Sequence, residues 1–138
     1  MTPIRASVRR VYVAAPKGAV ARARNVAAQV RALGLVVVST WHDGDVPSTD
    51  PSGFADALAI LRANVADLER ATTMIALPDR EVGRETYVEI GRALGEGYPI
   101  IMSAERGGLP LSWADPLVRV VGTDDDTVAE LARRMVYQ

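Results

Sequence analysis

One carboxylate, Glu89, has the sequence surroundings of a reactive anion. It lies in residues 86–91 (TYVEIG), which follow the apolar run 74–78 after a short charged loop that contains Gly83. We expect a strand, a glycine-bearing loop and a helix with Glu89 in its first turn. The unpaired N–H groups and the positive end of the helix dipole favour an ionised acid at that place. An anion held in this way can act as a nucleophile.

The same residues also fit a purely structural interpretation. Thr86 and Glu89 have the spacing of a capping box, in which the threonine hydroxyl bonds the N–H of the glutamate and the glutamate reaches back. Under that interpretation Glu89 only closes the start of its helix. The pattern alone leaves both possibilities open.

The composition excludes several kinds of chemistry. The chain has no cysteine and only one histidine, His42, which excludes thiolate nucleophiles, cysteine-bound zinc and a multi-histidine metal centre within one subunit. Its 16 basic and 17 acidic residues give a net charge of −1, which argues against a nucleic-acid or anionic-membrane binder. It has neither a signal-peptide core nor an apolar run of membrane-spanning length, so we expect a soluble, cytoplasmic protein.

The chain alternates between strand-like and helix-like segments. Five short apolar runs predict strands at 8–15, 35–41, 73–77, 98–103 and 117–121. Segments with helical periodicity lie between or after them, at 19–33, 54–71, 86–96 and 124–136. Residues 43–53 form a polar stretch without periodicity, which we expect to be a mobile loop.

This alternation predicts a single α/β domain over residues 1–138. Right-handed crossovers favour a doubly wound, flavodoxin- or Rossmann-like sheet of five parallel strands, with helices on both faces and strand order 2-1-3-4-5. Ligands of such sheets bind beyond the carboxyl ends of the strands, near the switch in strand order. That rule brings Tyr12, Lys17, His42 and Glu89 near one another.

Three segments follow one another in an order and spacing typical of one enzyme family. They are VYVAAP at 11–16, DLERA at 67–71, and EIGRALG at 89–95 followed by PII at 99–101. From about residue 10 to residue 103 the chain thereby resembles the nucleoside 2-deoxyribosyltransferases and their nucleotide N-hydrolase relatives.

The resemblance implies roles for three residues. Glu89 corresponds to the family's nucleophile, a carboxylate that stabilises an oxocarbenium-like state or forms a covalent glycosyl-enzyme. Asp67 corresponds to an aspartate that supplies a proton to the leaving base or binds the sugar, and Tyr12 to a tyrosine that orients the glutamate. No cofactor or metal is implied. Family members complete their sites across subunits, so we expect a homo-oligomer, at least a dimer, with the helices after the second and third strands as candidate interfaces.

Two of these residues have plainer explanations. Without the resemblance, Tyr12 is better explained as a core aromatic with its hydroxyl at the rim. A catalytic Asp67 requires a break in the helix near Asn64, because an unbroken helix carries Asp67 to the end away from the expected site. In that case Asp67 is a surface acid that pairs with Arg62, Arg70 or Arg133.

The resemblance also suggests substrate contacts in two loops. Lys17 and Gly18 lie where family members hold a sugar or a 5′-phosphate at the start of a helix. Gly83 is displaced from the glycine that often precedes the family's glutamate. Arg80 and Arg84, in the same loop as Gly83, either contact a phosphate or sugar or are simply solvated charges.

Three more residues are candidates for binding the substrate. Trp41 and His42 close the second strand and could stack on a base, although a histidine there is also typical of a polar strand end. Ser112 falls near the place where nucleotide hydrolases of this family carry a serine that reaches the phosphate in a neighbouring subunit.

The leading hypothesis is therefore an N-glycosidase that acts on a nucleoside or a nucleoside 5′-monophosphate. Water as acceptor makes it a hydrolase, and a second base makes it a transferase. One alternative is a catalytically silent nucleotide-binding or sensing domain on the same fold. Another is a different glutamate-dependent N-glycosidase, such as a phosphoribohydrolase or an NAD-cleaving domain.

Overall fold

Five parallel strands form one sheet in the order β2-β1-β3-β4-β5, as the sequence predicts. The computed structural model describes residues 10–43 and 53–136. Within these ranges the strands are β1 (Arg10–Ala14), β2 (Val36–Val37), β3 (Thr73–Ala76), β4 (Ile100–Ser103) and β5 (Val118–Val121). Residues 8 and 9 of the predicted first strand and residues 44–52 of the predicted loop lie outside the described residues.

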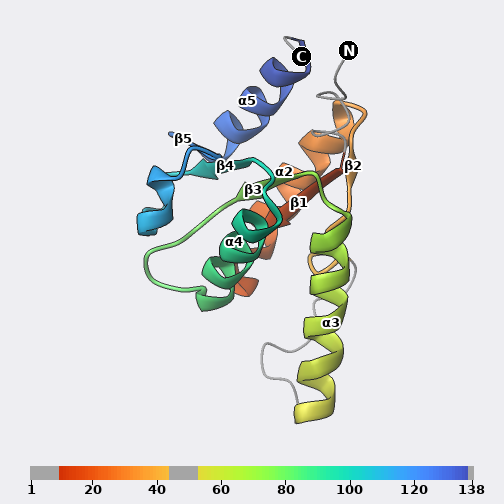
Figure 1. The fold of residues 1–138 in the computed structure, drawn as a ribbon. Helices are drawn as coiled ribbons and strands as arrows, with labels where there is room; N and C mark the ends of the chain where they lie inside the picture. Colours follow the sequence, from red (N-terminus) through yellow and green to blue (C-terminus); the bar gives the residue numbers. More distant parts are fainter. Residues whose placement is uncertain (1–9, 44–52, 137–138) are drawn as a thin grey trace.

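Helices cover both faces of the sheet (Figure 1). Helices α2 (Val20–Ala32) and α5 (Asp124–Val136) lie on one face, and α3 (Phe54–Arg70) and α4 (Arg84–Glu96) lie on the other. Two short 3-10 turns, η1 (Lys17–Ala19) and η2 (Leu111–Ala114), follow β1 and precede β5. The predicted doubly wound α/β fold is confirmed, and the bounds of α5 agree with the predicted helix.

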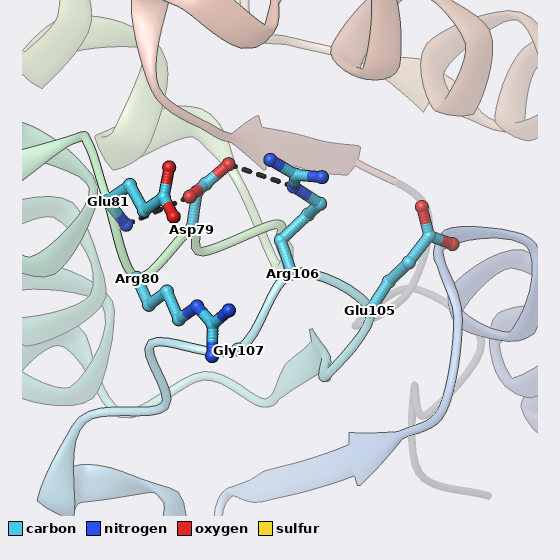
Figure 2. Close-up of a pocket in the computed structure, with 6 residues that line it drawn as sticks. All are labelled: Asp79, Arg80, Glu81, Glu105, Arg106 and Gly107. Atoms are coloured by element: carbon cyan, nitrogen blue, oxygen red, sulfur yellow. Dashed lines mark hydrogen bonds and ion pairs between the residues drawn. The ribbon is translucent and has the colours of Figure 1, made fainter.

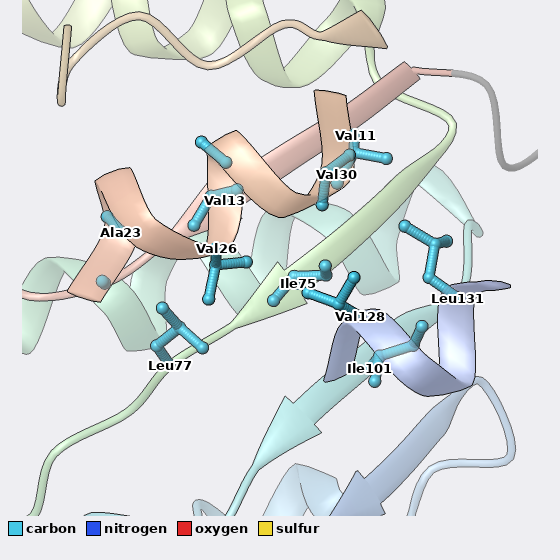
Figure 3. Packing of buried hydrophobic residues seen from close by; sticks show 12 residues of the cluster. Val11, Val13, Ala23, Val26, Val30, Ile75, Leu77, Ile101, Val128 and Leu131 are labelled. Atoms are coloured by element: carbon cyan, nitrogen blue, oxygen red, sulfur yellow. The ribbon is translucent and has the colours of Figure 1, made fainter. Parts of the chain in front are cut away.

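The alternation of side chains along β1 builds two cores. Val11 and Val13 face α2 and α5, where Val26, Val30, Val128 and Leu131 pack over Ile75 and Ile101 (Figure 3). Tyr12 and Ala14 face the other side, toward α3 and α4. Because successive residues of a strand point to opposite faces, Tyr12 is directed to the helices that carry Asp67 and Glu89.

Strand β2 is much shorter than the seven residues that the sequence predicts. Only Val36 and Val37 pair with β1, and Val38 adds one further bond, from its N–H to the carbonyl of Val11 at 2.8 Å. Val36 is exposed, as expected of a sheet edge. After Val38 the chain makes no further backbone hydrogen bonds of the β2–β1 pairing. The prediction of a strand up to residue 41 is therefore wrong, because side-chain hydrogen bonds hold residues 40 and 41.

Helix α4 begins two residues earlier than predicted, and this removes the capping box. Its N-cap is Gly83, which adopts the left-handed conformation with φ of 101°. Thr86 is therefore the third helical residue, and Glu89 lies in the second turn. The placement of Glu89 in the first turn is wrong, because the glycine conformation that starts the helix is not visible in apolar periodicity.

Helix α3 is a single helix of 17 residues, without the break near Asn64 that a catalytic Asp67 requires. Among the helices of residues 10–43 and 53–136, none is long and apolar enough to span a membrane.

Candidate active site

A cavity of about 720 Å³ opens beyond the carboxyl ends of β1 and β3. Its walls come from the loops after β1 and β2, from one side of α3 and from the start of α4. The lining residues are Ala15, Pro16, Lys17, Gly18, Thr40, Trp41, Ala57, Ile60, Leu61, Ala63, Asn64, Val82, Gly83, Arg84, Glu85 and Glu89. The cavity lies at the switch in strand order, the usual ligand site of such sheets.

Glu89 reaches this cavity from the buried face of α4. Its side chain lines the cavity, while only 9% of the residue is exposed. The phenol of Tyr12, on β1, donates a hydrogen bond to Oε2 of Glu89. Glu89 is thus held by a neighbouring strand and is not folded back onto the start of its own helix. Tyr12 is fully buried, and its hydroxyl meets the glutamate as the resemblance implies.

Burial controls the protonation of this pair. It raises the pKa of Glu89 to about 7, although the hydrogen bond from Tyr12 and the positive charges of Lys17 and Arg92 act in the opposite direction. Burial and the adjacent Glu89 carboxylate raise the pKa of Tyr12 far above its ordinary value, so the phenol keeps its proton. The pair therefore combines a fixed donor with a carboxyl group that exchanges its proton near neutral pH.

The rim near Glu89 contains both charged groups and helix starts. Lys17 and Gly18 belong to η1, while Arg84 and Glu85 form the first turn of α4, and all four line the cavity. Gly83 packs so tightly that a Cβ atom would lie 2.5 Å from Cγ of Pro16. The sequence-predicted residues Lys17, Gly18 and Gly83 therefore do lie at the cavity, beside Glu89.

Asp67 is not among the residues that line the cavity. It is buried, and its Oδ2 accepts hydrogen bonds from the N–H and the hydroxyl of Thr40, at 3.0 and 2.7 Å. Its Oδ1 accepts a bond from Nη2 of Arg70 at 2.9 Å. The predicted partner Arg70 is present, but Asp67 is not the surface acid that an unbroken helix suggested, because the Thr40 segment covers it.

Trp41 and His42 are in contact, but only Trp41 reaches the cavity. Trp41 lines the cavity, and its indole Nε1 donates a hydrogen bond to the carbonyl of Val13 at 2.8 Å. His42 is fully buried, packs edge-on against Trp41, and bonds through Nε2 to Oγ of Ser39 at 2.8 Å. Burial lowers the pKa of His42, which keeps the imidazole neutral. His42 therefore supports the wall and does not reach the cavity.

Ser39 and His42 are residue types that form nucleophile–base pairs in hydrolases, but no substrate can reach this pair. Oγ of Ser39 also accepts the N–H of Val13 at 3.0 Å, and both Ser39 and His42 are fully buried. A nucleophile must reach its substrate, so this contact joins the end of β2 to β1 and is structural.

Ser112 lies in η2 and does not line the cavity of its own chain. Its predicted role concerns a neighbouring subunit's substrate, and it stays a prediction. Thr86 is buried beside Gly83, and its hydroxyl has no hydrogen-bond partner among the described residues.

A second, smaller depression of about 290 Å³ lies at the loops after β3 and β4. Its charges compensate one another: Asp79 bonds Nε of Arg106 at 3.1 Å and the N–H of Glu81 at 2.9 Å (Figure 2). Arg80 also lines the depression, and its backbone packs against Gly108. Because Asp79 and Arg106 already bind each other at the centre of this depression, the larger cavity is the better candidate site.

Sequence reasoning missed the wall that α3 contributes to the cavity, and it missed Thr40 and Glu85. Ala57, Ile60, Leu61 and Asn64 line the cavity from α3, and their spacing of three and four residues was available as a signal. Thr40 carried no signal, because it was assigned to a strand that does not extend so far.

No model of a known protein family matches this chain, and no curated protein matches it. Within residues 10–43 and 53–136, no cluster of three or more acidic, histidine or cysteine side chains could hold a metal ion. The case for a function therefore depends on the geometry of the cavity.

Proposed function

We propose that the chain cleaves the N-glycosidic bond of a nucleoside or a nucleoside 5′-monophosphate. The observation that carries the proposal is the Glu89 carboxyl group, which lines a cavity of about 720 Å³ and is held there by the Tyr12 phenol. Such a volume is within the usual range for small-molecule sites, which is about 300–1,000 Å³. The resemblance of the sequence to deoxyribosyltransferases and nucleotide N-hydrolases points to the same chemistry.

The reaction proceeds through the carboxylate oxygen that Tyr12 does not occupy. Oε2 accepts the phenol hydrogen, so Oε1 of ionised Glu89 attacks the anomeric carbon. The new C–O bond forms as the C–N bond breaks, and the electron pair of that bond leaves with the base. The base takes up a proton from solvent. The glycosyl group then passes to water in a hydrolase or to a second base in a transferase.

Two basic groups of the rim, Lys17 and Arg84, favour substrates with an anionic group on the sugar, and the acidic Glu85 beside Arg84 opposes them. Lys17 and Arg84 line the cavity at the starts of η1 and α4, where backbone N–H groups also attract anions. Trp41 and Ile60 offer an apolar surface for the base. This division, polar beside Glu89 and apolar along α3, supports a nucleoside 5′-monophosphate over a free sugar.

A homo-oligomer remains part of the proposal. Leu61 and Val82 line the cavity and are 44% and 54% exposed, and Val88 on α4 is 49% exposed. A second copy seated over α3 and α4 would cover these side chains and narrow the opening. Light scattering coupled to size exclusion should give at least twice the monomer mass of 14.8 kDa.

We also expect a cytoplasmic location, since the chain has no cysteine.

Base release tests the proposed reaction. The purified chain should be incubated with the common ribo- and 2′-deoxyribonucleosides and their 5′-monophosphates, and free base measured by chromatography. Glu89→Gln should lower the rate of release at least about 1,000-fold, since it removes the nucleophile. Glu96→Gln, an exposed position on the same helix, is the matched control. Binding without release by the wild-type chain would instead identify a nucleotide-binding domain.

A further inference from the structure

The cavity wall after β2 depends on side-chain contacts for its position. Thr40 and Trp41 form this wall, but the paired part of β2 ends at Val37, and the last ladder-like bond is made by the N–H of Val38. Beyond that point Trp41 is fixed through its indole N–H to the carbonyl of Val13. Thr40 is fixed by two hydrogen bonds to one carboxylate oxygen, Oδ2 of Asp67.

Three hydrogen-bond donors of the protein contact the carboxyl group of Asp67. Thr40 occupies Oδ2 with two bonds, and Nη2 of Arg70 occupies Oδ1 while it also lies 3.3 Å from the carbonyl of Val38. The two oxygens of the carboxyl group therefore accept hydrogen bonds from three donors of the protein, an arrangement that holds neighbouring groups in place. Asp67 is also absent from the cavity lining, so it does not meet a ligand placed before Glu89.

We infer that Asp67 is a positioning residue that holds Thr40 and Trp41 as a preformed wall for the base. This inference rests on the proposed function, and it replaces the proton-donor role that the resemblance implies for Asp67. A wall that is fixed before the ligand arrives removes the cost of ordering it during binding. Loss of Asp67 should therefore weaken substrate binding more than it slows bond cleavage.

Substitutions at Asp67 separate positioning from proton donation, because both bonds from Thr40 go to the same oxygen. In Asp67→Asn an amide oxygen can replace Oδ2 and accept both bonds, whereas a proton donor would be lost. Asp67→Ala loses the wall contacts, and Thr40→Val loses only the hydroxyl bond. Arg70→Met is the matched control, since it removes the ion pair and the contact with the Val38 carbonyl but leaves both Thr40 bonds to Asp67 in place.

The variants should be made in a Trp113→Phe background, in which Trp41 is the remaining tryptophan, because the chain has only two. Acrylamide quenching of Trp41 then reports the wall without requiring activity. KM and kcat for base release from the 2′-deoxyribonucleoside 5′-monophosphates report the effect on the reaction. Circular dichroism should confirm that each variant folds. If Asp67→Ala does not fold, Thr40→Val and Asp67→Asn still distinguish a positioning residue from a proton donor.

We expect Asp67→Ala and Thr40→Val to raise KM about five- to tenfold, with kcat within about threefold of the parent, and to increase quenching of Trp41. Asp67→Asn should stay within about threefold in both constants, as should Arg70→Met. An Asp67→Asn variant that loses kcat as completely as Asp67→Ala would overturn the inference in favour of a proton donor. If the parent releases no base, the proposed function fails. Unchanged quenching in folded Asp67→Ala and Thr40→Val would then separately reject the positioning role.

Discussion

Tyr12 and Glu89 are 77 positions apart in the chain and are joined by a hydrogen bond from the phenol to the carboxylate Oε2. The bond connects β1, an inner strand of the sheet, to the second turn of α4. It is buried, and the other side of the glutamate faces a cavity. Burying a carboxyl group costs free energy, and carboxyl groups with a pKa shifted by burial beside a cavity are typical of functional sites.

The first prediction concerns the pH dependence of base release. If Glu89 attacks as an anion, kcat/KM should rise about tenfold per pH unit below pH 7 and level off above it, because the pKa of Glu89 is about 7. Initial rates between pH 5 and 9 measure this rise of kcat/KM, the acidic limb of the pH profile. A rate that falls as the pH rises through 7 would identify Glu89 as a proton donor, since that role needs the protonated form.

Tyr12→Phe should move this limb to higher pH. The hydrogen bond from Tyr12 lowers the pKa of Glu89, so its removal raises that pKa further above about 7. Hydrogen bonds to charged groups contribute about 1.5–3 kcal/mol, which corresponds to a shift of about 1–2 units. Activity at pH 7 should fall about 5- to 50-fold and recover in part at pH 9.

The control for that variant is Tyr98→Phe. Tyr98 is a second buried tyrosine in the same core, and its hydroxyl lies 3.4 Å from the carbonyl of Leu68. Its loss should leave the midpoint of the activity profile in place. Equal shifts in the two variants would mean that Tyr12 acts only through the core.

Glu89→Gln should stabilise the folded protein at alkaline pH. The pKa of Glu89 rises from 4.5 in the unfolded chain to about 7 in the fold, so its stability contribution is complete below pH 4.5 and is lost as the pH rises through 7. A neutral glutamine avoids that loss. The variant should exceed the wild type by about 3 kcal/mol at pH 8 and by little at pH 4.

Urea denaturation at the two pH values measures this difference. Glu96→Gln, on the exposed side of the same helix, should show no comparable gain. A Glu89→Gln protein that is less stable than the wild type at pH 8 would show that the ionised carboxylate is well compensated and is not held at a cost.

Gly83→Ala tests the start of α4, on which the position of Glu89 depends. A Cβ atom at this position would lie 2.5 Å from Cγ of Pro16, and the alanine would have to adopt a φ of 101°. We expect a loss of about 2–4 kcal/mol in unfolding free energy, which combines left-handed strain with overpacking. Gly97→Ala at the other end of α4 has a φ of 80° but open space, and it should lose only about 1–2 kcal/mol.

Thermal and chemical denaturation of the two variants measure the difference. Gly83→Ala should also lower base release more than Gly97→Ala does, because it displaces the first turn that lines the cavity. Equal stabilities in the two variants would show that the loop of Pro16 moves aside at little cost.

The strand order and α5 could be predicted because they depend on local periodicity and on general rules of chain connection. Apolar runs identify the strands, and right-handed crossovers give their order in the sheet. The acids at the start and the arginines at the end of residues 124–136 mark the two ends of α5. The contact between Tyr12 and Glu89 was also predictable, since the resemblance implies a tyrosine near the end of the first strand that orients the glutamate.

The details that failed depend on contacts between distant residues. The start of α4 is set by a left-handed Gly83 that fits against Pro16 from another loop. β2 ends early because Trp41 and Thr40 bond to β1 and α3 in place of the ladder. His42 turns inward to Ser39, and Asp67 is covered by Thr40 on an unbroken α3. Such pairings between side chains are not encoded in the periodicity of any one segment.

The most direct measurement is the identification of the glycosylated residue. A 2′-fluorinated nucleoside slows loss of the sugar from a glycosyl-enzyme, because fluorine destabilises the oxocarbenium-like state that both steps share. Mass spectrometry of the digested protein should find one sugar on the peptide that contains Glu89, and none in Glu89→Gln. A chain that releases base while the sugar is found on another residue, or that retains full activity as Glu89→Gln, would contradict the nucleophile assignment.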